Sequence, residues 1–263
     1  MDPIQEHYKK LAGVFGDSKE MSMEDTFTKE SEITEIIKNI TYFSRKKRSR
    51  KVLEIGCGNG YTARIMSDSL DIDYTGIDFC DDLVKIASER KIEKYRFNSG
   101  NVLDLEFRDN TFDIIFSERC LINLDSWEKQ KKSISEIFRV LKKGGIFIMV
   151  ECFTDGLDNL NEARRVLGLP PVVQKFHNLY FDKSAFMDFI EGKFSLYGKT
   201  HPDFASLQKS NFLSTYYYGR SVLYPAINQN KELEYNNKFV EFFSYLEPHG
   251  EYSYIQSIVL EKV

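Results

Sequence analysis

Through the middle of the chain, short hydrophobic runs alternate with longer stretches in which hydrophobic residues recur at helical spacing. The hydrophobic runs lie at residues 51–55, 74–78, 95–98, 112–117 and 146–150. Runs of this length predict buried strands, and the stretches between them predict amphipathic helices. Continuous apolar strands that alternate with helices are typical of a parallel sheet covered on both faces. The pattern therefore predicts an α/β fold.

The helices of this pattern have recognisable ends. Ser31 is a candidate N-cap for a helix at 31–44, and Asp81 or Asp82 can cap the helix after the second strand. Further helices are expected at 61–70, 127–141 and 182–190, and one more strand at 252–260. Gly144 and Gly145 are expected to end the helix at 127–141. Residues 1–30 are polar and 154–180 read as irregular, while 204–246 are rich in aromatic and polar residues.

A glycine-rich loop is the main chemical signal. Gly56-Cys57-Gly58-Asn59-Gly60 lies between the first strand and the following helix. Glycines permit positive φ and let a ligand approach the backbone, and ligands of open α/β sheets bind at the carboxyl ends of the strands. Glu54 precedes this loop, and Asp78 ends the second strand, where an acid can accept hydrogen bonds from ribose hydroxyls.

The spacing of the glycines distinguishes between cofactors. It is Gly-x-Gly-x-Gly, whereas the dinucleotide fingerprint that places a pyrophosphate at a helix N-terminus is Gly-x-Gly-x-x-Gly. A carboxylate at Glu54 fits a cation or an ammonium better than a pyrophosphate. S-adenosylmethionine carries a sulfonium and an ammonium and no phosphate.

These motifs together resemble the class I S-adenosylmethionine-dependent methyltransferases, most strongly from Lys51 to Cys152. The matching words are Val-Leu-Glu-Ile-Gly-Cys-Gly-Asn-Gly at 52–60, Gly-Ile-Asp at 76–78, Phe-Asp-Ile-Ile-Phe-Ser-Glu-Arg at 112–119 and Glu-Ile-Phe-Arg-Val-Leu-Lys-Lys-Gly-Gly at 136–145. The resemblance implies a Rossmann-like, doubly wound, mostly parallel sheet with an antiparallel C-terminal strand and a helical, aromatic cap. It implies a single domain over 1–263, with an N-terminal lid at 1–44, a cofactor core at 51–153 and a substrate cap with closing strands at 154–263.

The resemblance also implies a set of cofactor-binding residues. Glu54 and the loop would lie along the methionyl group, Asp78 would bind the ribose, and Phe79 would lie near the adenine. Asn101 stands where the family often has an aspartate that accepts from the adenine amino group, and the Val102 amide would meet a ring nitrogen. The full cofactor set is Glu54, Gly56, Cys57, Gly58, Asp78, Phe79, Asn101, Val102, Ser117 and Glu118.

Methyl transfer needs alignment of the acceptor with the sulfonium methyl and exclusion of water. A hydroxyl acceptor also needs a base, for which His177 is the candidate, whereas a neutral amine does not. Arg119 could steer the cofactor carboxylate or a substrate, or form a surface salt bridge. The residues expected to bind the acceptor are Tyr8, Arg119, Tyr180, Tyr216, Tyr217, Tyr218 and Arg220, whose alternative role is that of a packed aromatic cap.

The net charge, the cysteines and the hydrophobic runs of the chain disfavour several classes of protein. The formal net charge is -4, which gives no global attraction to nucleic acid or anionic membrane. The basic run at 45–51 is interpreted as a solvated helix end and linker, with a phosphate-binding patch as the alternative. Four separated cysteines form no Cys-x-x-Cys pair, and no metal site is expected. No leader pattern and no run of about 20 apolar residues is present. We therefore expect a cytoplasmic protein.

Three other functions stay open at this point. A nicotinamide-dependent oxidoreductase would share the glycine loop and Asp78, although the spacing and Glu54 disfavour it. A regulatory protein that binds the cofactor without catalysis would share every cofactor residue. A nucleic-acid methyltransferase is disfavoured by the acidic balance. The identity of the acceptor, the choice between nitrogen and oxygen, and the oligomeric state stay undetermined by sequence.

Overall fold

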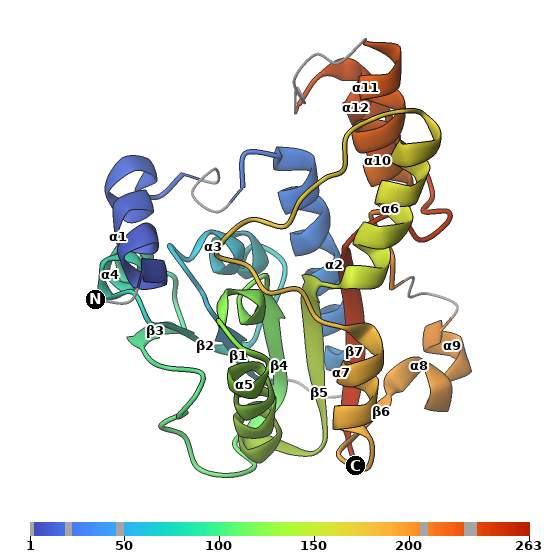
Figure 1. Ribbon diagram of the computed structural model, residues 1–263. Coiled ribbons are helices and arrows are strands. Elements are labelled where there is room, and N and C mark those ends of the chain that lie inside the picture. Colours follow the sequence, from blue (N-terminus) through green and yellow to red (C-terminus); the bar gives the residue numbers. More distant parts are fainter. Residues whose placement is uncertain (1–2, 19–22, 46–49, 206–209, 229–235) are drawn as a thin grey trace.

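A mixed, seven-stranded sheet forms the centre of the computed structural model, which describes residues 3–18, 23–45, 50–205, 210–228 and 236–263 (Figure 1). Its strand order is β3-β2-β1-β4-β5-β7-β6. The strands are β1 (Lys51–Ile55), β2 (Asp73–Asp78), β3 (Tyr95–Ser99), β4 (Phe112–Glu118), β5 (Leu141–Cys152), β6 (Phe194–Leu196) and β7 (Ile255–Lys262). Strands β1 to β5 pair in parallel, and β7 is antiparallel to both β5 and β6. The predicted mostly parallel sheet with an antiparallel C-terminal strand is confirmed.

Helices cover both faces of this sheet. In Figure 1, α5 and α7 lie in front of it and α2 lies behind, where α2 contacts β4 and β5. The helices are α1 (Pro3–Phe15), α2 (Thr26–Ser44), α3 (Tyr61–Ser67), α4 (Asp81–Glu89), α5 (Trp127–Val140), α6 (Thr154–Val166), α7 (Lys183–Ile190), α8 (Tyr197–Thr200), α9 (Pro202–Ala205), α10 (Ser214–Tyr218), α11 (Tyr224–Ile227) and α12 (Lys238–Ser244). A 3₁₀ turn, η2 (Leu121–Asn123), follows β4, and a π turn, η3 (Gly219–Leu223), joins α10 to α11.

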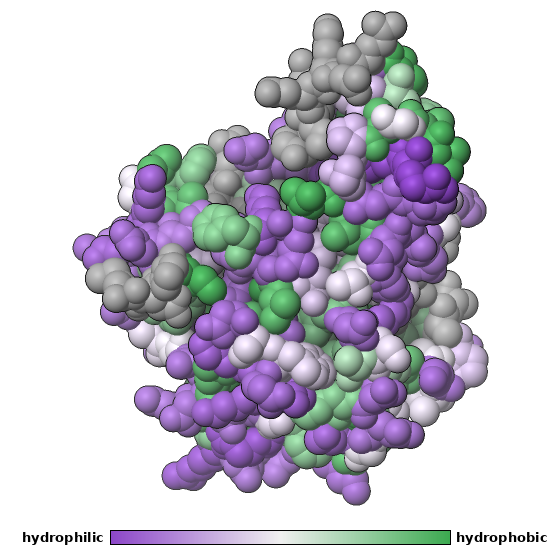
Figure 2. All heavy atoms as spheres, viewed as in Figure 1, coloured by the Kyte–Doolittle hydropathy of each residue, from purple (hydrophilic) through white to green (hydrophobic). Residues whose placement is uncertain are grey.

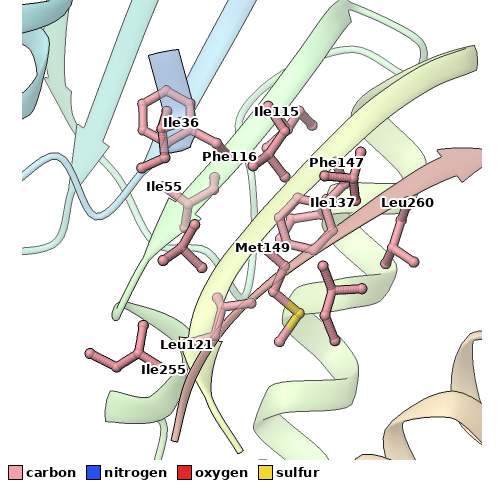
Figure 3. Close-up of a cluster of buried hydrophobic side chains, with 14 of the residues drawn as sticks. Ile36, Ile55, Ile115, Phe116, Leu121, Ile137, Phe147, Met149, Ile255 and Leu260 are labelled. Atoms are coloured by element: carbon pink, nitrogen blue, oxygen red, sulfur yellow. The ribbon is translucent and has the colours of Figure 1, made fainter. Parts of the chain in front are cut away.

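The core lies between the sheet and its helices. Ile36 of α2 and Phe116 of β4 are fully buried on one face, and Phe147 of β5 and Ile137 of α5 are fully buried on the other (Figure 3). Leu260 of β7 joins this cluster and closes the edge of β5. Since every central strand is buried on both faces, side chains at the strand ends are held on a rigid base.

Several expected element ends were wrong. Helix α2 begins at Thr26 because Asp25 is its N-cap and accepts from the Thr28 amide, so Ser31 lies inside the helix. Residue Cys80, with no side-chain cap, precedes α4, and Asp81 and Asp82 lie in its first turn. Helix α5 ends at Val140, and Gly144 and Gly145 lie within β5.

Two helices lie in segments for which no helix was expected, the polar region 1–30 and the segment 154–180 that read as irregular. Helix α1 occupies much of the polar N-terminal region, where its C-terminal half buries Ala12 against Leu83 of α4. Helix α6 begins at Thr154, directly after β5, with Leu160 fully buried. Its Gly156 packs against the backbone of Ser253, which leaves no room for a side chain. These contacts are tertiary, so local periodicity gave little sign of them.

The cysteines form no disulfide bonds. All four are free thiols, and only Cys120 is partly exposed. Within the basic run, residues 46–49 lie outside the described residues. None of the described helices has the length and apolarity of a membrane span. The surface in Figure 2 is mainly hydrophilic, with hydrophobic patches set between the polar residues.

Candidate active site

A cavity opens at the carboxyl ends of β1, β2 and β4, and its water-accessible volume is about 220 Å³. Its walls come from α1, the start of α2, the glycine loop, the segments after β2, β3 and β4, and the first turn of α5. Among the described residues, no group of three or more histidine, cysteine or acidic side chains is placed to hold a metal ion. The chemically distinctive lining residues are the glycines, the acids and the cations Lys29, Arg119 and Lys129.

The glycine loop forms the floor of the cavity. Gly56, Gly58 and Gly60 have φ values of 76°, 50° and 72°, a conformation that favours glycine. A Cβ at Gly56 would collide with the Cys120 thiol. The amides of Gly56 and Cys57 both donate to the Ile77 carbonyl, at 2.8 and 2.9 Å. The loop is thus held against β2 with its open side toward the cavity.

Asp78 is fixed beside this loop. One carboxylate oxygen accepts from the Gly58 amide and the other from the Cys80 amide, both at 2.9 Å. Burial raises the pKa of Asp78, and these backbone donors oppose that effect. Each oxygen keeps a further lone pair that can accept from a ligand hydroxyl.

Glu54 lies at the opposite end of the loop and is buried. It accepts a hydrogen bond from the Tyr74 hydroxyl, and burial raises the pKa of Glu54 to about 8. A buried carboxyl with a raised pKa favours a cationic partner, because a nearby positive charge restores its ionised form.

A pair of opposite charges stands next to Glu54. Lys29 of α2 donates to Glu118 at 2.6 Å and to Thr62 at 3.2 Å, and Thr62 donates to the second Glu118 oxygen at 2.8 Å. Burial alone would raise the pKa of Glu118, but Lys29 and Arg119 bring it below its usual value. Lys29 and Glu118 therefore present one ammonium and one carboxylate to the same cavity.

Arg119 continues this charged wall. Its backbone has φ 48°, a strained conformation for a residue with a side chain. Its guanidinium donates to Glu32 of α2 at 2.8 Å and lies 4.0 Å from Glu118. Arg119 does form the salt bridge of the alternative interpretation, but not at the surface, because Glu32 is fully buried and the Arg119 side chain is only 12% exposed.

Helix α1 covers the cavity from outside. Ile4 and Tyr8 line it, and the Tyr8 ring meets the Phe79 ring edge-on at 5.9 Å. Burial strongly raises the pKa of Tyr8. Asn59 of the glycine loop donates to the carbonyls of Gly16 and Ser18, which ties the end of α1 to the loop.

The segment after β3 forms the wall opposite the loop. Gly100, Asn101 and Val102 line the cavity. The side-chain oxygen of Asn101 accepts from the Leu103 amide at 2.9 Å, so a ligand amino group would have to share this oxygen. Ser117 is fully buried and is not among the lining residues. All other residues expected to bind the cofactor do line the cavity.

Most residues expected to bind the acceptor lie away from the cavity. His177 stacks on His7, with ring centroids 4.7 Å apart, and does not line the cavity. Arg220 and Tyr216 both bind Asp25, and Arg220 lies over the Tyr217 ring. These side chains are buried because they compensate the charge of Asp25 at the start of α2.

The two remaining tyrosines pack on the C-terminal segment. Tyr180 stacks on Tyr254 at 5.4 Å, and Tyr218 tilts against Tyr252 at 4.7 Å. Neither lines the cavity. Of the residues expected to bind the acceptor, the structure thus brings Tyr8 and Arg119 to the cavity.

Sequence reasoning missed Lys29, Thr62 and Asn123, which also line the cavity. A signal was present for Lys29. Asp25, Lys29 and Glu32 recur at helical spacing and so share one face of α2, the face that turns inward. Such a polar stripe on a helix that also buries Ile33, Ile36 and Ile40 indicates a functional or ion-paired surface.

Comparisons with known proteins agree with this geometry. Residues 53–149 match the model of a methyltransferase domain. A sterol 24-C-methyltransferase of Aspergillus fumigatus is 35% identical over 127 residues, 46% of this chain and 33% of that protein. Phosphoethanolamine N-methyltransferase 2 of Caenorhabditis elegans is 33% identical over 115 residues, 42% of this chain and 26% of that protein. The chain thus spans about a third or less of the length of these two relatives.

A solved structure extends the similarity of fold beyond the core. The PH0226 protein of Pyrococcus horikoshii aligns with a TM-score of 0.52 and 21% identity, covering 72% of this chain and 90% of that one. The sheet order, the glycine loop with its acids and the matched region agree: residues 53–149 form a methyltransferase domain with a Rossmann-like fold.

Proposed function

We propose that the protein binds S-adenosylmethionine in this cavity and transfers its methyl group to a nitrogen or oxygen of a small-molecule acceptor. The observation that supports this most is the convergence of Glu54, the glycine loop, Asp78 and Glu118 on one cavity in a methyltransferase domain. The family uses S-adenosylmethionine as the methyl donor.

The charges of the cavity suit the methionyl group of this cofactor. That group carries an ammonium, a carboxylate and, next to them, the sulfonium. Glu54 and Glu118 would hold the ammonium and face the sulfonium, and Lys29 would bind the carboxylate. The bound cofactor supplies an electrophilic methyl whose leaving group is a neutral thioether.

The other half of the cavity suits the adenosine. Asp78 would accept from both ribose hydroxyls. Phe79, Asn101 and Val102 would surround the adenine, with the Val102 amide meeting a ring nitrogen. Ser117 would not touch the cofactor, and it would only support the cavity wall as part of the buried end of β4.

For the acceptor, Tyr8 and Arg119 are the residues that we propose, because both line the cavity. The guanidinium of Arg119 matches a carboxylate or phosphate, so a sugar acid or a phosphorylated metabolite is a suitable acceptor. His177 has no such support as a general base, since it stacks on His7 outside the lining. An amine acceptor that attacks in its neutral form needs no base.

Two measurements test this function. Calorimetry should show binding of adenosylhomocysteine and none of NADH, and binding of NADH instead would favour an oxidoreductase. The full chain should then convert S-adenosylmethionine carrying a labelled methyl group into adenosylhomocysteine when mixed with pools of small amines, sugars and phosphorylated metabolites. Binding without turnover on any pool would favour a regulatory protein over an enzyme.

A further inference from the structure

A second feature of the site lies at its outer edge, where two segments far apart in sequence meet. The first is α1, whose residues Ile4 and Tyr8 line the cavity. The second is the strap, defined here as residues 167–182, which joins α6 to α7 and crosses above the carboxyl edge of the sheet (Figure 1). Each is held to the body of the protein by its own contacts.

The strap is fixed near its two ends. Val172 exchanges two hydrogen bonds with the Asn161 side chain of α6, at 2.8 and 3.0 Å. Leu179 donates to the Ile122 carbonyl of η2 and accepts from Gln130 of α5. Between these points, Val173 and Phe176 are 76% and 85% exposed. The middle of the strap therefore has little packing of its own.

Helix α1 is held mainly by its C-terminal half. Leu11, Ala12 and Phe15 pack with Leu83 and Ile86 of α4. The N-terminal half, which covers the cavity, touches this cluster through Tyr8 and meets the middle of the strap through His7.

The contact between the two segments is made by histidines. The rings of His7 and His177 stack at 4.7 Å with an interplanar angle of 29°, and His7 also meets Phe176 edge-on at 6.2 Å. Nδ1 of His177 is buried and has no hydrogen-bond partner among the described residues. A proton added there would create a buried, unpaired cation facing a second imidazole.

We propose that His7 and His177 form a latch that joins α1 to the strap over the cofactor cavity, and that protonation of this pair opens it. Neutral rings stack, whereas two imidazolium rings at this separation repel each other. Opening would free the N-terminal half of α1 and with it Tyr8, which leaves the cavity accessible for cofactor exchange. The inference rests on the proposed function in one respect, namely that the cavity holds the cofactor.

A cation near the latch acts in the same direction. Burial, aided by His7 and by Lys175 on the strap, lowers the pKa of His177. The charged residues nearest to His7 along α1 are one acid, Glu6, one position before it, and two cations, Lys9 and Lys10, two and three positions after it. A histidine whose pKa is lowered in the closed state favours closure while it is neutral. The closed state is therefore fully favoured above about pH 7 and weakens as the pH falls through about 6.5.

The test is the dissociation rate of labelled adenosylhomocysteine at pH 8 and pH 5.5, for the full chain and two variants. His7→Phe keeps an aromatic ring and removes the proton site, and His249→Asn removes an exposed histidine elsewhere as the matched control. Between the two pH values, dissociation from wild type and from the control should accelerate about fourfold more than dissociation from His7→Phe. This factor corresponds to the repulsion of two unit charges about 5 Å apart in water-like surroundings.

The outcomes separate the latch from the cofactor assignment. Equal acceleration in wild type and His7→Phe would overturn the latch while adenosylhomocysteine still binds. Absence of binding at either pH would overturn the proposed function itself. Amide hydrogen exchange provides a second measurement: exchange of residues 4–8 should be faster at pH 5.5 than the intrinsic pH dependence predicts, and only in proteins that retain His7.

Discussion

Removal of the Asp78 carboxylate should weaken cofactor binding by an amount that its geometry defines. Both oxygens already accept a backbone amide at 2.9 Å, from Gly58 and from Cys80, which fixes the carboxylate on the cavity wall. In Asp78→Ala, two hydrogen bonds from the ribose to a charged acceptor are lost. A hydrogen bond to a charged group contributes about 1.5–3 kcal/mol, and part of the loss is offset when water solvates the freed hydroxyls. We therefore expect a total loss of about 1.5–3 kcal/mol, or about 10- to 150-fold in the dissociation constant.

Calorimetric titration with adenosylhomocysteine measures this change directly. Asp82→Ala is the matched control, because Asp82 is an exposed acid four residues further along, in the first turn of α4, and does not line the cavity. The control should bind like wild type. Thermal unfolding of both variants shows whether the Gly58 and Cys80 amides, left without their acceptor, disturb the fold. If a folded Asp78→Ala protein bound as tightly as Asp82→Ala, the ribose assignment would be wrong.

Three further results are expected. Gly58→Val should abolish adenosylhomocysteine binding and leave the helical circular dichroism near that of wild type, because φ is 50° at Gly58 and β-branched residues avoid this conformation; normal binding would remove the loop from the site. Arg220→Met should destabilise the protein toward urea by about 3–5 kcal/mol, since it leaves Asp25 buried without its cation, and the double variant Asp25→Asn, Arg220→Met should recover part of this loss. Because burial raises the pKa of Glu54 to about 8, protonation of Glu54 stabilises the folded state at low pH, and this stabilisation is lost as the pH rises through about 8. The unfolding temperature of Glu54→Gln, measured from about pH 6 to about pH 9, should therefore fall less steeply with pH than that of wild type.

The elements that the sequence predicted correctly are those whose hydrophobic pattern along the chain matches their burial in the structure. The hydrophobic runs at β1, β2 and β4 are buried on both faces, so their composition alone marks them as strands. The glycine loop and Asp78 follow directly from those strand ends. For this reason most residues predicted to bind the cofactor line the cavity, and their contacts with the cofactor stay a prediction.

The acceptor half could not be predicted because it depends on pairings across the fold. Tyr216 and Arg220 lie in a run of tyrosines that suggests a ligand pocket, yet both bind Asp25, nearly two hundred residues away in sequence. Arg119 stayed ambiguous for the same reason, since its partner Glu32 is on α2. The periodicity of a helix predicts which of its faces turns inward, but not which charged residue of another element will contact that face.

Helix α2 gives these observations a common cause. Its inward face carries three charged residues in succession: Asp25 binds Arg220 of η3, Lys29 binds Glu118 on the cavity wall, and Glu32 binds Arg119. A buried charge is stable only when it is paired, so each residue on this face fixes the position of its partner. The η3 turn and this wall of the cavity are therefore positioned by one helix.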